Sequence, residues 1–426
     1  VKDVERITLR VPFTERVRRW NALLVWQWQI VEIIRVTTDD GSVGYGETLP
    51  HYTWGKVSDE AIERVRGSNP AELLGDDSLG AGLQMAIYDV VGKALEVPVH
   101  RLFNLSKVRD WCPIAWWNTK MSPEDLAGEA QDAVRDGYIF HKFKTRPWFD
   151  VYEQVEAISA VTPPHYRLDM DWNGMLMNVG TAVPVMQRLD QYERVSIYEG
   201  PINQADVEGQ RELRRKVAKP IALHFGSPPF HTAVREAVCD GFVIGGGVSA
   251  VLRQGQLAGE FEKPFWLQMV GVGLVTALSA HLGAVLPFAQ WPTITCMNNY
   301  TDQLLNEPLT ICGGYLQVPD GPGLGVEVNE DALMKYAMEE PYQLPDERHI
   351  LSVVWQGGRV VHFANMKDHC WPHFRQRGND PAQEPGVTLE IWDDDGSNEW
   401  NDLYARLQQG PIREQRGGAS SGNIGF

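Results

Sequence analysis

The sequence predicts an α/β protein whose largest part is a closed parallel (β/α)8 barrel. Two observations lead to this fold class. From about residue 110 to 300, short apolar runs rich in β-formers alternate with amphipathic stretches of helical period. This unit occurs eight times, and eight short alternating units fit a closed parallel barrel better than an open, doubly wound sheet.

The expected barrel strands end in polar or glycine residues and follow one another at regular spacing. They comprise residues 112–118, 138–144, 166–173, 195–201, 220–226, 241–247, 264–270 and 294–299. Helix signals lie between them: Ser122 is an N-cap followed by Pro123 at the first helical position, and Gly137 follows the end of that stretch. We therefore expect helices to connect successive strands.

Residues 1–105 have a different pattern, that of a separate α+β module. Antiparallel strands are expected around an Asp-Gly turn near residue 40, followed by a helix near 80–95. The barrel then occupies residues 106–330. Residues 331–426 contain the rest of a helix, a strand pair within 350–363, and a Gly/Ser-rich tail that we expect to be mobile.

Charge and cysteine content limit the partners and the compartment. The chain has 426 residues, a formal charge of −17 and a pI near 5.1, which argues against nucleic acid or an anionic membrane surface as the main partner. Five scattered cysteines without a C-x-x-C pair are typical of reduced thiols. No run is long and apolar enough to span a bilayer, so we expect a soluble, cytoplasmic protein.

The stretch RLDMDWNG places three polar side chains on one face of a buried strand. Asp169, Asp171 and Asn173 share one parity, because side chains alternate between the two faces. In a parallel barrel, chemistry lies at the carboxyl ends of the strands. The polar or glycine residues expected at those ends, in strand order, are Lys142 and Lys144, Asp171 and Asn173, Glu199, His224, Gly245, Gln268 and Asn298.

Two interpretations of these charges stay open at this point. Asp171 and Glu199 at neighbouring strand ends repel each other unless a hard cation such as Mg²⁺ or the lysines neutralise them. The other interpretation is an internal ionic layer in which Lys142 pairs with Asp169 or Asp171. We expect the deeper Asp169 to pair with a lysine in either case.

Lys142 and Lys144 face the same way, and a lysine beside another cation loses proton affinity and can act as a general base. The plain alternative is a solvated strand end. His224 is interpreted as a histidine satisfied at a strand terminus rather than a ligand, His281 as a core residue, and residues 369–374 (HCWPHF) as a surface feature.

Several of these motifs together resemble the enolase superfamily, in particular the mandelate racemase/muconate lactonising enzyme family. The matching segments are GSVGYGET (41–48), KFK (142–144), DMDWN (169–173), YEGP (198–201), PIAL (220–223) and VPDGPGLGVEVNEDAL (318–333). The resemblance implies a modified TIM barrel with an N-terminal capping domain to which the C-terminal segment returns. It also implies Mg²⁺ held by acids at strands three to five, and abstraction of a proton α to a carboxylate. Asp171 and Glu199 match the first two metal ligands.

The sequence departs from the family pattern after the fourth strand. His224 stands where the third acid is expected, and imidazole suits Mn²⁺ better than Mg²⁺. Gly245 and Gln268 stand in place of the acid–base groups of strands six and seven, and Asn298 or Asn299 in place of the strand-eight acid. Moving a proton between two faces of a carbon needs a titratable group on each side, so a two-base racemase is disfavoured.

We therefore expect a metal-dependent, dehydratase-like lyase acting on a hydroxy or sugar acid, with Mg²⁺, or Mn²⁺ if His224 ligates. Lys144 is the expected general base, with Lys142 as the less favoured candidate, and His224 is the expected general acid. Substrate contacts are expected from Asn173, Gln268, Thr48, His51, Tyr52 and Trp54. The alternatives are a racemase or epimerase with His224 as second base, and a non-catalytic descendant that binds an acidic ligand. A homo-oligomer is compatible with this family.

Overall fold

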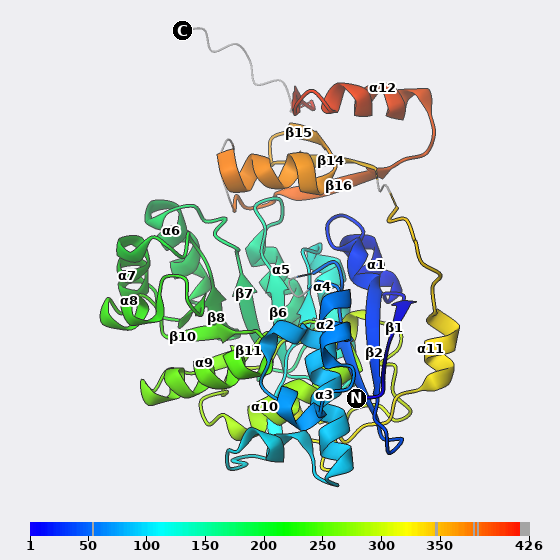
Figure 1. Ribbon diagram of the computed structural model, residues 1–426. Helices are drawn as coiled ribbons and strands as arrows, with labels where there is room; N and C mark the ends of the chain where they lie inside the picture. Colours follow the sequence, from blue (N-terminus) through cyan, green and yellow to red (C-terminus); the bar gives the residue numbers. More distant parts are fainter. Residues whose placement is uncertain (53–54, 346–347, 378–379, 381–382, 418–426) are drawn as a thin grey trace, which may run out of the picture.

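A computed structural model describes residues 1–52, 55–345, 348–377, 380 and 383–417. Figure 1 shows a barrel with the N-terminal elements beside it and a separate layer, coloured orange to red, across one end. The expected mobile tail lies outside the described residues from 418 onward. Among the described residues, no helix is long and apolar enough to cross a membrane.

The N-terminal module (residues 1–105) is built on three antiparallel strands. These are β1 (Asp3–Arg10), β2 (Ile30–Thr37) and β3 (Val43–Thr48), in the order β1-β2-β3. Helix α3 (Ala81–Ala94) packs on β3 so closely that a Cβ on Gly46 would overlap the carbonyl of Gly82. The remaining elements of this module are α1 (Glu15–Asn21), η1 (Trp26–Gln29), α2 (Asp59–Val65), η2 (Pro70–Leu73), η3 (Asp77–Leu79) and η4 (Val99–Phe103).

The barrel sheet is parallel and has the order β11-β10-β9-β8-β7-β6-β5, which is sequence order reversed. Each strand is three to five residues long and most of its residues are buried, as expected where both faces are covered. The strands are β5 (Trp116–Asn118), β6 (Phe140–Lys144), β7 (Arg167–Asp171), β8 (Val195–Glu199), β9 (Ile221–His224), β10 (Gly241–Ile244) and β11 (Phe265–Leu267).

Residues 293–295 complete the barrel as its eighth position. Ile294 forms a parallel bridge to Gln268 beyond β11, and Thr293 forms one to Ile114 before β5. The last residues of the expected eighth strand instead form a short turn, η5 (Met297–Asn299). The (β/α)8 barrel fold is confirmed, with a short eighth strand that pairs through single bridges.

Helices connect the barrel strands as predicted. Ser122 caps the first of them by accepting a hydrogen bond from the backbone N–H of Asp125. The helices are α4 (Pro123–Arg135), α5 (Val151–Val161), α6 (Val179–Leu189), α7 (Val207–Lys216), α8 (Phe230–Arg235), α9 (Val248–Glu260) and α10 (Gly273–Val285). A small sheet outside the barrel comprises β4 (Trp111–Pro113), β12 (Ile311–Cys312) and β13 (Tyr315–Gln317).

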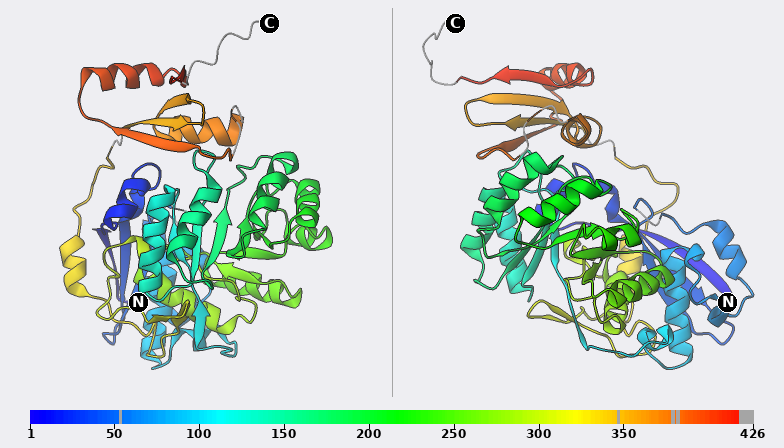
Figure 2. Two further views of the ribbon diagram at one scale, coloured as in Figure 1. Left: turned by 180° about the vertical axis from the view of Figure 1, so that it is seen from behind. Right: turned by 90° about the vertical axis from the view of Figure 1, so that its left-hand side faces the viewer.

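After α11 (Glu330–Tyr336), which lies along β1, the chain forms the C-terminal module (residues 348–417). Its antiparallel sheet has the order β16-β14-β15-β17. The elements are β14 (His349–Val354), β15 (Arg359–Ala364), η6 (Met366–Cys370), η7 (His373–Arg377), β16 (Thr388–Asp393), α12 (Asn398–Leu407) and β17 (Ile412–Gln415). Figure 2 shows this sheet and its helices stacked on the end of the barrel.

The two faces of this sheet contribute to different cores. Leu351 and Val361 belong to the same apolar cluster as the barrel, whereas Ile350 and Ala364 pack with Trp400 of α12. The expectation that residues 369–374 are a surface feature is wrong. Cys370, His373 and Phe374 are buried, because η6 and η7 fill the space between the sheet and the barrel. His281 is a core residue as expected, and its ring stacks on that of His100.

Candidate active site at the barrel end

The strand register brings the predicted charges to one level. Lys144 pairs with Asp171 across β6 and β7, and Asp171 pairs with Glu199 across β7 and β8. Each of the three is the last residue of its strand. Since neighbouring strands in a sheet lie about 4.8 Å apart, these side chains meet at the carboxyl end of the barrel.

Two lysines neutralise the two carboxylates. The Lys144 ammonium contacts Asp171, and the Lys142 ammonium contacts Glu199 and lies 3.8 Å from Asp171. Lys142, Asp171 and Glu199 are at most 2% exposed, whereas the Lys144 side chain is 17% exposed. Lys144 is therefore the member of this group that solvent or a ligand reaches most easily.

The pKa values of the buried pair move in opposite directions. Burial alone would raise the pKa of Glu199, but Lys142 and His224 outweigh it and hold that pKa well below its ordinary range. Burial would lower the pKa of Lys142, but Glu199 and Asp171 outweigh it and raise that pKa. Both groups are thus ionised, as a satisfied buried ion pair requires.

Asp169 does not pair with a lysine as we expected. Lys142 is its register partner, but the Lys142 ammonium lies against Glu199, one level nearer the strand end. A strand rises about 3.3 Å per residue, and the four-carbon stem of lysine spans about two residues of that rise. Burial raises the pKa of Asp169 to about 7, and the positive charge of Lys142 only partly opposes this.

The later strands supply mainly neutral groups at the same end. His224 Nε2 lies 3.1 Å from Glu199 Oε1, and its side chain is 41% exposed. Gln268 Oε1 accepts a hydrogen bond from Lys142 Nζ at 3.2 Å. Gly245 has no room for a side chain, because a Cβ would lie 2.7 Å from the carbonyl oxygen of Gln268. Asn298 exchanges two hydrogen bonds with the backbone of Trp117, so it ties the eighth strand to the first.

Three of the N-terminal residues that were expected to contact the substrate make contacts within the protein itself. Thr48 is buried and its hydroxyl donates to the Gly55 carbonyl at 3.3 Å. His51 Nε2 lies 2.6 Å from the Tyr342 hydroxyl, and the Tyr52 ring packs edge-on to Trp28. Trp54 lies outside the described residues.

Arg146 is a charged residue of this barrel end that the sequence analysis did not single out. It continues the alternation of Lys142 and Lys144 two residues further, which was the available signal. Its guanidinium donates to the carbonyls of Thr145 and Asp171 and, at 2.6 Å, to Asn173 Oδ1. Arg146 therefore fixes the loop that follows β7.

The C-terminal module covers this part of the barrel end. The Trp371 ring lies 4.8 Å from the Arg146 guanidinium carbon and packs on Trp148. Asp150, the N-cap of α5, also accepts a hydrogen bond from the Gly386 N–H at 2.8 Å. The loop between β6 and α5 is thus held beneath the module.

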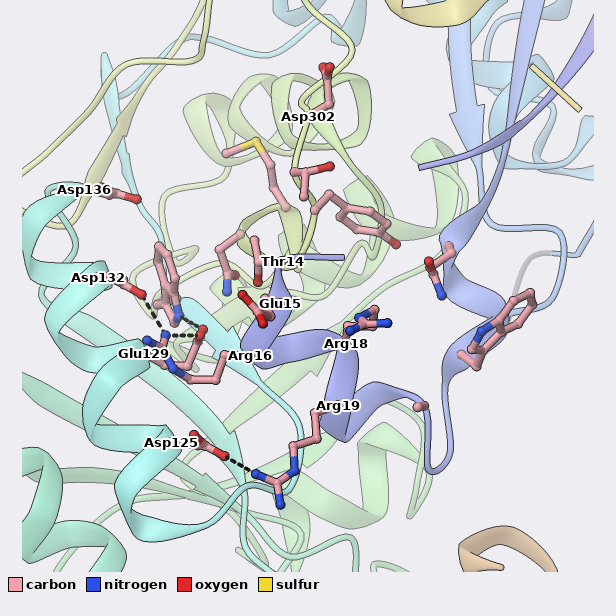
Figure 3. Close-up of a pocket in the computed structure, with 18 of the residues that line it drawn as sticks. Thr14, Glu15, Arg16, Arg18, Arg19, Asp125, Glu129, Asp132, Asp136 and Asp302 are labelled. Carbon is pink, nitrogen blue, oxygen red and sulfur yellow. Dashed lines mark hydrogen bonds and ion pairs between the residues drawn. The ribbon is translucent and has the colours of Figure 1, made fainter. Parts of the chain in front are cut away.

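A groove of about 1370 Å³ lies outside the barrel end, between α1, α4 and the edge of the C-terminal module. Figure 3 shows Arg16 of α1 reaching toward Glu129 and Asp132 of α4, and Arg19 facing Asp125. These charges pair with one another on the outer side of a barrel helix. The groove therefore does not contain the strand-end lysines and acids.

The donor types at the barrel end suit a divalent cation. Asp171 and Glu199 offer the oxygen ligands that Mg²⁺ prefers, and His224 offers a nitrogen beside Glu199. In this structure the lysines lie against the carboxylates instead. Within the described part of the chain, no three His, Cys, Asp or Glu side chains are grouped so as to hold a metal ion.

Comparison with known proteins agrees with this fold. The family profile described as Enolase C-terminal domain-like matches residues 125–332. A D-gluconate dehydratase of Thermoproteus tenax is 24% identical over 81% of this chain and 75% of its own. An N-succinylamino acid racemase of an Amycolatopsis species is 28% identical over 60% of this chain and 70% of its own.

Solved structures of this family have a similar fold. A mandelate racemase/muconate lactonizing family protein from an Azoarcus species has a TM-score of 0.64 and 25% identity, and the match covers 80% of this chain and 98% of that chain. An enolase from Thermobispora bispora, complexed with magnesium and formate, has a TM-score of 0.66 and 22% identity, with 79% and 91% covered. By the family-profile match, residues 125–332 belong to the enolase C-terminal domain-like family. The fold over about four-fifths of the chain is similar to that of mandelate racemase/muconate lactonizing family structures.

Proposed function

We propose that this protein is a divalent-metal-dependent lyase that removes the proton α to the carboxylate of a hydroxy or sugar acid and eliminates a β-hydroxyl. The observation that carries the proposal is the exposure of Lys144, since the neighbouring Lys142, Asp171 and Glu199 are almost fully enclosed. A base must reach the substrate proton, and among these charged groups Lys144 is the accessible one. Relatives named as gluconate, arabinonate and xylonate dehydratases support the reaction class.

Asp171 and Glu199 are the proposed metal ligands, with His224 as third donor. A bound cation would stabilise negative charge on the substrate carboxylate as the proton leaves. Mg²⁺ is the proposed cofactor, with Mn²⁺ favoured if the imidazole ligates. The two lysine ammonium groups would have to leave the carboxylates for the cation to bind, which frees Lys144 for its role as base.

His224 is the proposed acid for the leaving hydroxyl, because it is half-exposed beside Glu199 on the next strand. Gln268 and Asn173 are proposed to orient the substrate, and Thr48, His51, Tyr52 and Trp54 to select it. A racemase or epimerase is less well supported. It needs a titratable group across the substrate from Lys144, and strands six and seven end in Gly245 and Gln268.

A second candidate function is a non-catalytic protein that binds an acidic ligand. It is favoured by the ion pairs of Lys142 with Glu199 and of Lys144 with Asp171, which neutralise the carboxylates without a metal. In that case the two lysines and the two carboxylates form a permanent ionic layer inside the barrel.

Titration calorimetry of Mg²⁺ and Mn²⁺ on chelator-stripped protein separates the two candidates. We expect one site that is lost in Asp171→Asn and weakened in His224→Ala, followed by turnover of an acid-sugar library that falls about 10²–10⁴-fold in Lys144→Met. Absence of binding by the wild type to either metal would contradict the lyase and support the binding protein.

The compartment and the domain division are proposals as well. The five cysteines are unpaired in the structure, and four of them are buried, which fits a reducing cytoplasm. We propose residues 1–105, 106–330 and 331–426 as the domain divisions, and a small carboxylic acid as the partner.

A further inference from the structure

Lys120 is a buried cation without a counter-ion at the same barrel end. It lies two residues after β5, is 1% exposed, and its Nζ has no hydrogen-bond partner among the described residues. Burial, together with the nearby charges of Arg146 and Lys144, lowers the pKa of Lys120 to about 7. An unpartnered buried amine is costly and calls for an explanation.

Arg146 is its cationic neighbour on the adjacent strand loop. Its terminal nitrogens donate to two carbonyls and to the Asn173 side chain, none of which carries a negative charge. Its Nε is buried and has no partner in the described part of the chain. Burial lowers the pKa of Arg146 to about 10, although Asp171 and Glu199 oppose the shift.

The charges at this end do not balance. The carboxylates of Asp171 and Glu199 are already paired with Lys144 and Lys142, and burial raises the pKa of the remaining acid, Asp169, to about 7. Lys120 and Arg146 therefore remain as two further buried basic groups without a carboxylate partner among the described residues. The chain as a whole carries a net charge of −17, so general electrostatics does not account for this cluster. A bound anion would stabilise the charged forms of both groups and would use their free donors.

We propose that Lys120 and Arg146 form an anion subsite that holds a second carboxylate of the substrate, so that the substrate is a dicarboxylic acid. This inference rests on the proposed function, because the first carboxylate belongs to the proton-abstraction site of Lys144. The free Lys120 ammonium and the free Nε–H of Arg146 can each donate to one oxygen of a carboxylate. The comparison with inorganic phosphate below tests whether the subsite prefers a carboxylate.

The C-terminal module closes the subsite. Trp371 stacks on the Arg146 guanidinium, and Cys370 of η6 lies close enough to Lys120 for the two to influence each other's ionisation. Because Lys120 is enclosed, an anion enters only when η6 moves. A bound dianion should therefore hold η6 and η7 in place.

The test uses the full chain with excess chelator, so that it does not depend on a metal or on turnover. Malonate and succinate are titrated by calorimetry, with acetate and inorganic phosphate as comparisons, into wild type, Lys120→Met and the control Lys107→Met. Lys107 pairs with Asp110 and Asp320, away from this end. We expect a dicarboxylate to bind wild type and the control equally, and Lys120→Met at least about tenfold more weakly.

A second readout is thermal unfolding of the same three proteins. Without anions, Lys120→Met should unfold at a higher temperature than wild type, since the variant loses an unpaired buried charge. The dicarboxylate should then stabilise wild type but not the variant, and should slow hydrogen exchange in residues 366–375.

Equal dicarboxylate binding by wild type and Lys120→Met, or phosphate binding tighter than either dicarboxylate, would overturn the inference. Lack of binding by all four anions would also overturn it. None of these results bears on metal binding at Asp171, so the subsite and the proposed lyase fail separately.

Discussion

The two halves of the barrel's carboxyl end differ in charge and in what covers them. Strands one to four end near Lys120, Lys142 and Lys144 and carry the acids Asp171 and Glu199. Strands five to eight end in His224, Gly245, Gln268 and Asn298, of which only the histidine has an ionisable side chain. Groups for acid–base chemistry therefore lie mainly on one side of a bound substrate.

The covers of the two halves are also attached differently. The N-terminal module reaches the ends of strands six and seven through carboxylates: Glu47 accepts backbone N–H groups at the start of α10, and Asp77 accepts those of Ser249 and Ala250. The C-terminal module holds the charged half largely through rings, with Trp371 and Phe374 against Trp148. A polar attachment should respond to pH, whereas an aromatic one should not.

The largest expected effect comes from breaking the charge balance of the first half. Glu199→Gln leaves Lys142 enclosed without its main counter-charge and should lower the free energy of unfolding by about 3–5 kcal/mol. Gln268→Met removes one hydrogen bond to the same lysine and should cost about 1.5 kcal/mol. Denaturant unfolding measures both values. Equal losses would mean that the Glu199–Lys142 ion pair is not the main support of this half.

The attachment of the N-terminal module should depend on pH. Burial raises the pKa of Glu47 from 4.5 to about 7, although three backbone N–H groups favour the charged form. Because the folded state binds this proton more tightly, its contribution is complete below about pH 4.5 and is lost as pH rises through 7, by at most about 3 kcal/mol.

Unfolding free energies measured from pH 4.5 to 8 check this linkage. The difference between wild type and Glu47→Gln should change over that interval, since the variant no longer titrates there. Glu60→Gln, at an exposed position on α2, serves as the matched control and should keep the wild-type profile. Parallel profiles for wild type and Glu47→Gln would contradict the assignment.

The attachment of the C-terminal module should weaken when its ring contacts are removed. Trp371→Ala removes the contacts of the Trp371 ring with Arg146 and Trp148. It should lower the free energy of unfolding by about 2 kcal/mol, since the side chain is only half-buried. Hydrogen exchange should accelerate in β14–β17 and stay unchanged in β1–β3. Trp28→Ala, on the N-terminal side, should give the opposite pattern. Acceleration in both modules from either variant would show that the two covers are not independent.

A weaker effect is expected from one of the contacts between the N-terminal module and the segment that leads to the C-terminal module. Tyr342→Phe removes the hydrogen bond to His51 and should lower stability by about 1 kcal/mol or less. Thermal unfolding is the measurement. A loss above about 2 kcal/mol would indicate that this contact helps to hold the C-terminal segment on the N-terminal module.

The barrel and the positions of the strand-end charges could be predicted from local sequence patterns. Both follow from local regularities: an apolar run of fixed length, a cap such as Ser122, and a side-chain alternation that keeps Lys142 and Lys144 on one face. The same alternation extends to Arg146, and reading it two residues further would have included that arginine. The order of the strand ends likewise placed Asp171 beside Glu199 before any contact was known.

Which charges pair and which remain unpaired depends on packing between distant parts of the chain. The register pairs Lys142 with Asp169, but the length of the lysine stem carries its charge to Glu199, and no local pattern encodes that reach. Residues 369–374 were expected at the surface, yet Cys370, His373 and Phe374 are buried because this segment lies between the C-terminal sheet and the barrel, whose residues are distant in sequence. Lys120 is isolated for the same reason: burial is set by what packs on top, and that partner comes from the opposite end of the sequence.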